Sequence, residues 1–143
     1  MAIVRTARAT DADGVRRLAA TFPTPTPPSP EAFADALAAK LADPASCLLV
    51  SEHDGQLVGY VAGCFHSTFY AGGRTAWVDE ILVAELSRGG GIGRQLMTAF
   101  EEWARQHGCV LVSLATRGAA TFYEHLGYAS KAAYYKKYLI ESP

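Results

Sequence analysis

The chain has 143 residues, half of them hydrophobic and 19% charged, which fits one domain over residues 1–143 with a core of its own. Its formal net charge of −1 gives no electrostatic footprint for nucleic acid or an anionic membrane. No stretch approaches the ~18 apolar residues of a membrane span, and the N-terminus lacks the apolar run of a signal peptide.

The first third of the chain predicts one strand and two helices. Alternating apolar residues over Ile3–Ala9 indicate a strand, and Thr10 has the character of a helix N-cap. Apolar residues at helical spacing then predict a helix over Asp11–Phe22. Five prolines among residues 23–30 exclude both a helix interior and a central strand, so this stretch is expected to be a stiff loop.

A second helix is predicted to start at Pro30, because Ser29 is a good N-cap and proline suits the first helical position. Asp43-Pro44 ends this helix. Its expected buried stripe consists of Phe33, Leu37 and Leu41.

Three strands with tight turns between them are predicted next. A short apolar run covers Cys47–Ser51, and Asp54-Gly55 is a typical hairpin turn. The returning strand covers Gln56–Phe65. After the turn at Gly72-Gly73, a long strand rich in Trp, Val, Ile and Leu covers Thr75–Val83.

The last part of the chain alternates helices and strands. Apolar residues from Ile92 to Trp103 predict a helix that Gly108 ends, followed by a strand over Val110–Ala115. A short helix is expected over Ala119–Leu126, and one or two closing strands over Tyr128–Ile140. The order β-α-α-β-β-β-α-β-α-β predicts an α/β (α+β) domain with a mixed, mostly antiparallel twisted sheet and helices on both faces.

The glycine-rich turn from Arg88 to Arg94 predicts an anion site. Glycines let the backbone come close to a ligand, and the following helix directs free N–H groups and its positive dipole end outward. A P-loop is excluded, because Gly93 is not followed by Lys and then Ser or Thr. A dinucleotide fingerprint is excluded too, because arginine stands at its last glycine position.

Two motifs resemble the GNAT superfamily of N-acetyltransferases. The turn "RGGGIGR" matches the superfamily's Arg/Gln-x-x-Gly-x-Gly/Ala signature at Arg88, Gly91 and Gly93. The preceding "DEILV" resembles its fourth strand, and "ATFYEHLGY" (Ala120–Tyr128) resembles its second motif. The match covers roughly Thr75–Tyr128, and the element order of the remainder agrees with it.

The resemblance implies acetyl-CoA as the co-substrate, with no metal. It implies that backbone groups of Ile81, Leu82 and Val83 pair with the pantetheine arm. The pyrophosphate would lie against the turn formed by Arg88, Gly89, Gly90, Gly91, Ile92, Gly93 and Arg94. The chain departs from the pattern at residues 115–119, which lack the usual Asn, so that Thr116 or Arg117 is left to replace its contact with pantetheine.

Tyr123 is the candidate general acid, because it stands where the superfamily's proton-donating tyrosine lies and a phenol has a basicity similar to that of a thiolate. Asp79 and Glu80 are the candidate bases. Adjacent strand residues point to opposite faces unless a bulge intervenes, so Asp79 is expected to share a face with Trp77, Ile81 and Val83. Asp79 is therefore the preferred candidate for the base, and Glu80 is the second candidate.

The acceptor is expected to be a primary amine of a small molecule or peptide, with Phe22, Phe69 and Tyr70 lining an apolar pocket near His66. No His or Cys spacing indicates a metal site. The three cysteines are read as free thiols in strands, which favours a reducing, cytoplasmic setting. Dimers are frequent among look-alikes, so a homodimer is a further expectation.

Two other functions remain open. A non-catalytic acyl-CoA binding or sensing module would keep the glycine turn without needing Tyr123. A nucleotide-binding protein of another fold would bind ATP or NAD in competition with CoA.

Overall fold

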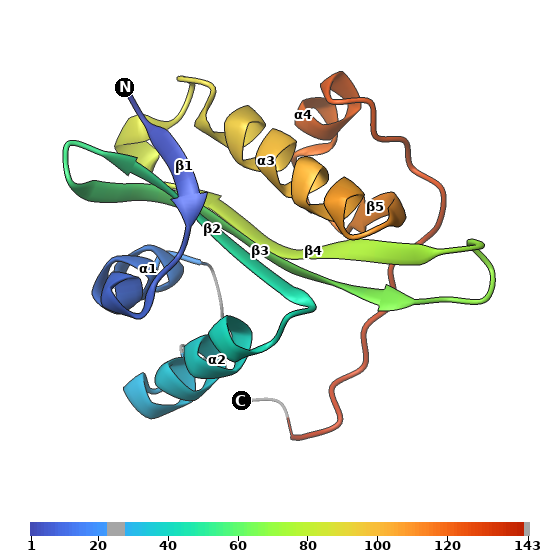
Figure 1. Cartoon of the computed structure of the whole chain (residues 1–143), viewed down its shortest axis with the longest axis horizontal. Coiled ribbons are helices and arrows are strands. Elements are labelled where there is room, and N and C mark those ends of the chain that lie inside the picture. The colour runs from blue at the N-terminus through green and yellow to red at the C-terminus, as the bar shows by residue number, and fades with distance from the viewer. Residues whose placement is uncertain (23–27, 142–143) are drawn as a thin grey trace.

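A computed structural model describes residues 1–22 and 28–141 (Figure 1). Five strands form one sheet: β1 (Ile3–Thr6), β2 (Ser46–His53), β3 (Gln56–Ser67), β4 (Arg74–Val83) and β5 (Cys109–Leu114). The helices are α1 (Ala12–Ala19), α2 (Pro30–Ala42), α3 (Ile92–Gln106) and α4 (Ala120–His125), with 3₁₀ turns at Ala9–Asp11 and Glu85–Ser87. Of the proline-rich loop predicted over residues 23–30, residues 23–27 lie outside the described part.

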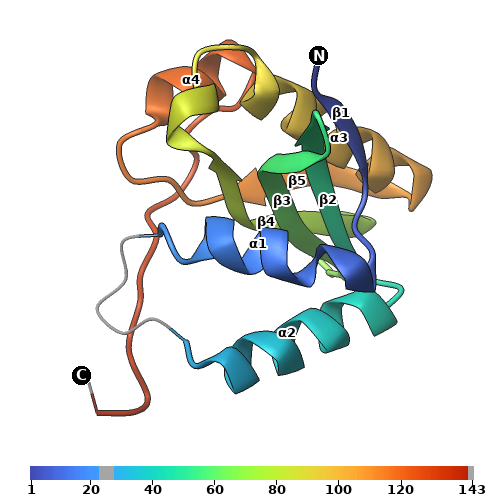
Figure 2. The same cartoon turned by 90° about the vertical axis from the view of Figure 1, so that its left-hand side faces the viewer.

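The strands lie in the order β1-β2-β3-β4-β5, and all neighbours are antiparallel except the parallel pair β4 and β5. Helices α1 and α2 cover one face, and α3 and α4 lie on the other (Figure 2). The expected mixed, mostly antiparallel sheet with helices on both faces is therefore confirmed.

Each sheet face has its own core. On the α1/α2 face, Leu18 and Leu37 pack against Val50 and Leu82, among others. On the α3 face, Leu96, Met97 and Phe100 are fully buried against β3 and β4. Burial of these large side chains is the main favourable term holding both layers to the sheet.

Local chemistry sets the turns as predicted. Ser29 caps α2 by accepting a hydrogen bond from the Ala32 backbone N–H at 3.1 Å, with Pro30 at the first helical position. Asp54 and Gly55 both have positive φ (51° and 76°), as the tight β2–β3 hairpin requires. Leu41 departs from the predicted stripe, because its side chain is exposed at the end of α2.

The closing strands predicted over Tyr128–Ile140 are wrong. No strand is assigned in the described residues after α4, and the chain instead runs past the β5 side of the sheet (Figure 1). Tyr128 packs against the α3-side core at the start of this segment, and the ring of Tyr134 stacks on Trp77 with centroids 6.4 Å apart. A segment forms a strand only when its backbone pairs with a neighbouring strand. The tyrosine-rich composition of these residues was therefore not sufficient to predict one.

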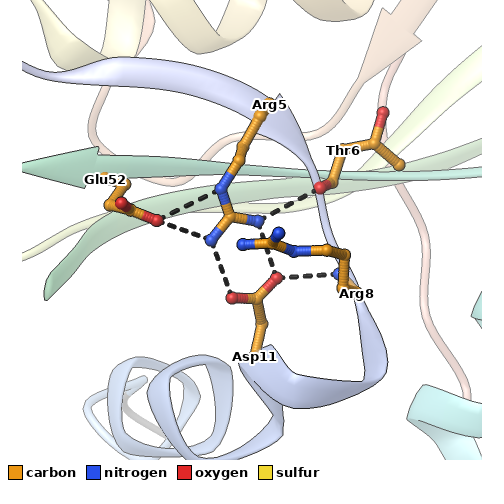
Figure 3. Close-up of polar contacts among 5 residues, drawn as sticks. All are labelled: Arg5, Thr6, Arg8, Asp11 and Glu52. Carbon is orange, nitrogen blue, oxygen red and sulfur yellow. Dashed lines mark hydrogen bonds and ion pairs between the residues drawn. The ribbon is translucent and has the colours of Figure 1, made fainter. Parts of the chain in front are cut away.

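The start of the first helix also differs from the prediction. Asp11, and not Thr10, organises this end, because its carboxylate accepts a hydrogen bond from the Arg8 backbone N–H at 2.7 Å. The same carboxylate receives two hydrogen bonds from the Arg5 guanidinium, which also binds Glu52 on β2 (Figure 3). This bidentate pairing ties β1, β2 and α1 together.

The paired Arg5 guanidinium and, to a lesser extent, the Arg8 N–H lower the pKa of Asp11 from 3.8 to about 2. A carboxyl group with a depressed folded-state pKa stabilises the protein above its unfolded pKa and loses this contribution as the pH falls from 3.8 towards 2. We expect Asp11→Ala to lower the free energy of unfolding by about 2 kcal/mol at pH 7 and by much less near pH 2.

Urea unfolding at several pH values measures this difference. The matched control is Asp13→Ala, which removes an exposed carboxylate two residues away and should cost less than ~0.5 kcal/mol. A loss for Asp11→Ala that is independent of pH would show that its pairing with Arg5 does not stabilise the fold.

Candidate active site

The edge of β4 that faces β5 is only half paired. The parallel ladder joins Arg74–Val78 to Cys109–Leu114 and then stops, whereas β4 continues to Val83 alongside β3. Over residues 79–83, the edge facing away from β3 therefore has no strand partner in the described structure. This is an open row of backbone donors and acceptors that a ligand with amide groups can pair with.

Alternation along the ladder shows which residues offer those groups. The Ala84 N–H donates to the Val58 carbonyl at 2.8 Å, so the backbone groups of Ala84 and, two residues earlier, Leu82 face β3. The backbone N–H and carbonyl groups of Ile81 and Val83 consequently face the open edge. The Nε–H of Arg88 donates a 3.1 Å hydrogen bond to the Val83 carbonyl. This contact agrees with a Val83 carbonyl that faces the open edge.

The glycine-rich turn follows this open edge and begins α3. Gly91 is the N-cap with a φ of 86°, a left-handed conformation that favours glycine. It offers no side chain to cap the helix, and no backbone acceptor is assigned in the described structure to the N–H groups of Ile92, Gly93 and Arg94. The surrounding positions Arg88 to Gly91 and Arg94 are exposed, so free donors, a helix dipole and two cationic side chains share one accessible surface.

Gly93 permits the close approach of α3 to α4. A Cβ atom at this position would lie 3.2 Å from Phe122 Cζ and 3.9 Å from Val83 Cγ2. A side chain at this position would require the Phe122 ring to shift by a few tenths of an ångström. The second glycine of the motif therefore has a packing role that holds α4 beside the turn and the end of β4.

Tyr123 lies on α4 in the core of the α3 face and is 8% exposed. Its ring meets Phe122 and Tyr128 edge to face, with centroids 4.9 Å and 5.9 Å away. Its hydroxyl has no hydrogen-bond partner assigned among the described residues. Burial raises the pKa of Tyr123 above 10, so the phenol keeps its proton at neutral pH.

A bulge in β4 changes the expected faces of the acidic residues. Val78 is opposite Gly63 and Glu80 is opposite Ala62, so Asp79 is the extra residue with no partner on β3. Ile81 and Val83 therefore pack into the α3-side core, away from the α1/α2 face on which Glu80 meets Tyr60. The expectation that Asp79 shares a face with Ile81 and Val83 is wrong.

The two carboxylates have different partners on the α1/α2 side. Asp79 lies 3.5 Å from the Lys40 ammonium of α2. Glu80 accepts a 2.8 Å hydrogen bond from the hydroxyl of Tyr60, whose phenol pKa is raised by burial and then by the adjacent Glu80 charge. The sequence pointed to neither Lys40 nor Tyr60, because both contacts depend on how α2 and β3 meet β4.

Several predicted acceptor residues are not brought together. Phe69 and Tyr70 stand fully exposed in the turn between β3 and β4, whereas Phe22 packs against the α1/α2-side core. These three residues therefore do not line one pocket. His66 is exposed at the same turn-proximal end of β3, opposite Thr75 and away from Glu80.

No group of three or more His, Cys, Asp or Glu side chains that could hold a metal ion occurs in the described residues. No helix found there is long and apolar enough to cross a membrane. Cys47, Cys64 and Cys109 are free, and burial raises the pKa of the Cys47 thiol to about 12.

Known proteins resemble the chain in sequence. A family model described as the acetyltransferase (GNAT) family matches residues 13–128. An aminoalkylphosphonate N-acetyltransferase from Salmonella typhimurium is 36% identical over 105 residues, which cover 68% of this chain and 66% of that protein. N-alpha-acetyltransferase 80 from Mus musculus is 43% identical over 51 residues, or 36% of this chain and 16% of that protein. The matches thus span less than two thirds of the length of these relatives.

Solved structures share the fold over nearly the whole chain. A transcriptional regulator from Bacillus halodurans C-125 has a TM-score of 0.88 at 25% identity, covering 97% of this chain and 100% of that one. A glucosamine-6-phosphate N-acetyltransferase from Arabidopsis thaliana has a TM-score of 0.87 at 18% identity, covering 98% and 99%.

Proposed function

Because the chain belongs to the acetyltransferase (GNAT) family, we propose that it transfers the acetyl group of acetyl-CoA to a primary amine of a small molecule or peptide, by direct attack in a ternary complex. The observation that carries this proposal is the open β4 edge, with a glycine turn at one end and a buried tyrosine on the neighbouring helix. Such an edge suits an amide-bearing arm, and the turn suits a pyrophosphate.

We assign the donor to this edge. The outward-facing backbone groups of Ile81 and Val83 would pair with the amides of pantetheine, whereas Leu82 is engaged with β3. Arg88 would release the Val83 carbonyl as the donor arrives. The free N–H groups of Ile92, Gly93 and Arg94 would receive the pyrophosphate, and Gly89, Gly90 and Gly91 leave its path unobstructed.

Acid and base would act from opposite faces of β4. The amine nitrogen attacks the thioester carbonyl carbon, and the carbon–sulfur bond breaks as the tetrahedral intermediate collapses. The Tyr123 phenol, on the α3 side, protonates the leaving thiolate. A carboxylate on the α1/α2 side, directly or through water, takes the proton that the ammonium loses before the attack. The second proton, which the nitrogen loses after the attack, returns through water to the Tyr123 phenolate and restores the phenol. An outward N–H of Ile81 or Val83 would stabilise the oxyanion.

Glu80 is the better candidate for the base. Asp79 is already engaged in an ion pair with the Lys40 ammonium at 3.5 Å. Glu80 is partly buried, and its assigned hydrogen-bond partner among the described residues is the neutral Tyr60 hydroxyl. Through its ion pair with Lys40, Asp79 would instead hold α2 in place on the acceptor side of the site.

We expect Glu80→Gln to lower kcat/KM about 100-fold at pH 7, whereas Asp79→Asn lowers it less than about 10-fold. The deficit of Glu80→Gln should shrink as the pH approaches the pKa of the acceptor, because the amine then loses its proton to solvent. Initial rates of thiol release between pH 6 and 10 measure this effect. A deficit that stays constant over this range would exclude Glu80 as the base.

The negative charge on the α1/α2 side of β4 also favours one class of acceptor. The Glu80 carboxylate would attract a cationic ammonium to the α1/α2 side of β4, on the side opposite Tyr123. One relative is named for acetylating aminoalkylphosphonates, so 2-aminoethylphosphonate belongs in the first acceptor panel, together with diamines, amino acids and peptide N-termini.

The competing function is an acyl-CoA sensing module, and one structural relative is named as a transcriptional regulator. Saturable CoA binding without thiol release from any amine would favour this function. A reducing, cytoplasmic setting completes the proposal and is supported by the three free thiols.

A further inference from the structure

Lys40 differs from every other lysine of the sequence in its surroundings. The others, Lys131, Lys136 and Lys137, stand exposed in the segment after α4. Lys40 lies near the end of α2, and its side chain is 28% exposed. Because α2 covers the α1/α2 face of the sheet, the Lys40 side chain reaches to β4, the strand that carries the proposed site.

The Lys40 ammonium lies on the proposed acceptor side of the site. Its Nζ atom is 3.5 Å from Oδ2 of Asp79. Glu80 is the next residue of β4, and the bulge at Asp79 leaves both carboxylates on the α1/α2 side. A primary amine of the chain itself is therefore held in the region to which the proposed function brings the amine of the acceptor.

The donor would end in the same region. The ladder between β4 and β5 stops at Val78, so the open edge of β4 begins at Asp79. In the proposed donor site, the pyrophosphate lies at the glycine-rich turn beyond Val83, and the pantetheine arm runs back along Val83 and Ile81. The acetyl thioester at the far end of this arm would then lie at the start of the open edge, next to Asp79 and the lysine paired with it.

We propose that the protein acetylates its own Lys40 when acetyl-CoA is bound and no acceptor is present, an inference that rests on the proposed acetyl transfer. The Lys40 ammonium gives one proton to Asp79, its partner in the ion pair. The neutral nitrogen attacks the thioester carbonyl carbon, the carbon–sulfur bond breaks, and Tyr123 protonates the departing thiolate. The second proton of the nitrogen returns through water to the Tyr123 phenolate. The products are N-acetyl-Lys40, free CoA and one proton, which Asp79 releases to solvent.

The reaction would be intramolecular, because the amine and the site belong to one chain. A lysine ammonium stands on a flexible four-carbon stem, so its nitrogen can leave Asp79 and approach a nearby carbonyl carbon. The rate constant should therefore not depend on the concentration of the protein. Acetylation also removes the charge of Lys40, so the ion pair with Asp79 is lost and the acceptor side of β4 becomes more negative.

The test is incubation with acetyl-CoA alone, followed by intact-mass measurement and peptide mapping. We expect the wild type to gain one acetyl group on Lys40, at least about 20-fold faster than on Lys131, Lys136 or Lys137. Lys40→Arg keeps a cation beside Asp79 but stays protonated, so it should abolish this gain in mass. Lys131→Arg is the matched control, which makes the same change at an exposed lysine and should keep the gain. Melting temperatures show whether both variants are folded.

Two further measurements separate self-acetylation from direct chemical acetylation by acetyl-CoA. A large excess of free CoA, which fills the donor site without an acetyl group, should stop the reaction at Lys40. The half-time should also stay constant over about a 50-fold range of protein concentration. Acetylation that persists under excess CoA, accelerates with protein concentration or spreads evenly over the exposed lysines would overturn the proposal.

The outcome for small amines distinguishes this inference from the proposed function. Acetylation of a small amine without acetylation of Lys40 would overturn the inference and leave the proposed function intact. CoA binding with neither a small amine nor Lys40 acetylated would overturn both, because no acetyl group is then transferred.

Discussion

Tyr123→Phe lowers turnover at least 100-fold and leaves the affinity for CoA nearly unchanged, if the phenol protonates the departing thiolate. The substitution removes one oxygen atom and keeps the ring, which packs against Phe122 and Tyr128 in the α3-side core. The stability of the fold should therefore change little. Steady-state thiol release gives turnover, and calorimetry gives the affinity for CoA.

Tyr128→Phe is the matched control. It makes the same chemical change on a neighbouring ring, but the hydroxyl of Tyr128 is engaged with Glu101 and not with the β4 edge. We expect its turnover to fall less than about threefold. Equal losses in the two variants would show that Tyr123 contributes to packing and not to proton transfer.

Gly91→Glu should weaken CoA binding by 100-fold or more. The backbone of the new glutamate would have to adopt a φ of 86°. Its carboxylate would lie among the helix N–H groups that are proposed to receive the pyrophosphate. Strain and charge repulsion both oppose binding at this position. Calorimetric titration with CoA measures the change directly.

Gly55→Glu is the matched control, because it introduces the same charge and a similar backbone strain at a position away from the proposed CoA site. Gly55 has a φ of 76°, and a Cβ at either glycine would meet nothing within 4 Å, but Gly55 lies in the β2–β3 hairpin. This variant carries the same charge and similar backbone strain, and it should bind CoA like the wild type. Unchanged affinity in Gly91→Glu would mean that the donor lies elsewhere.

Features set by neighbouring residues could be predicted from the sequence. The Asp54-Gly55 turn, the Ser29 cap and the glycine-rich start of α3 depend on a few adjacent residues, and their backbone geometry agrees with the predictions. The apolar spacing from Ile92 to Trp103 likewise predicted helix α3. Local conformational preference and helical period are sufficient for such features.

Features that depend on distant partners could not be predicted. The bulge at Asp79 arises from the register between β3 and β4, and it moved Ile81 and Val83 to the other face. The Glu80–Tyr60 hydrogen bond needs two strands to be paired first. Residues 128–140 have the composition of a strand but no strand partner among the described residues, so their composition predicted a tendency and not a structure.

The most direct test of the account is transfer of an isotopically labelled acetyl group from acetyl-CoA to the amine panel, followed by mass spectrometry of the products. The account predicts one labelled acetyl group on the nitrogen of at least one primary amine, one equivalent of free CoA, and loss of both products in Tyr123→Phe. Tight CoA binding with no labelled amine across the panel would contradict catalysis and favour an acyl-CoA sensor.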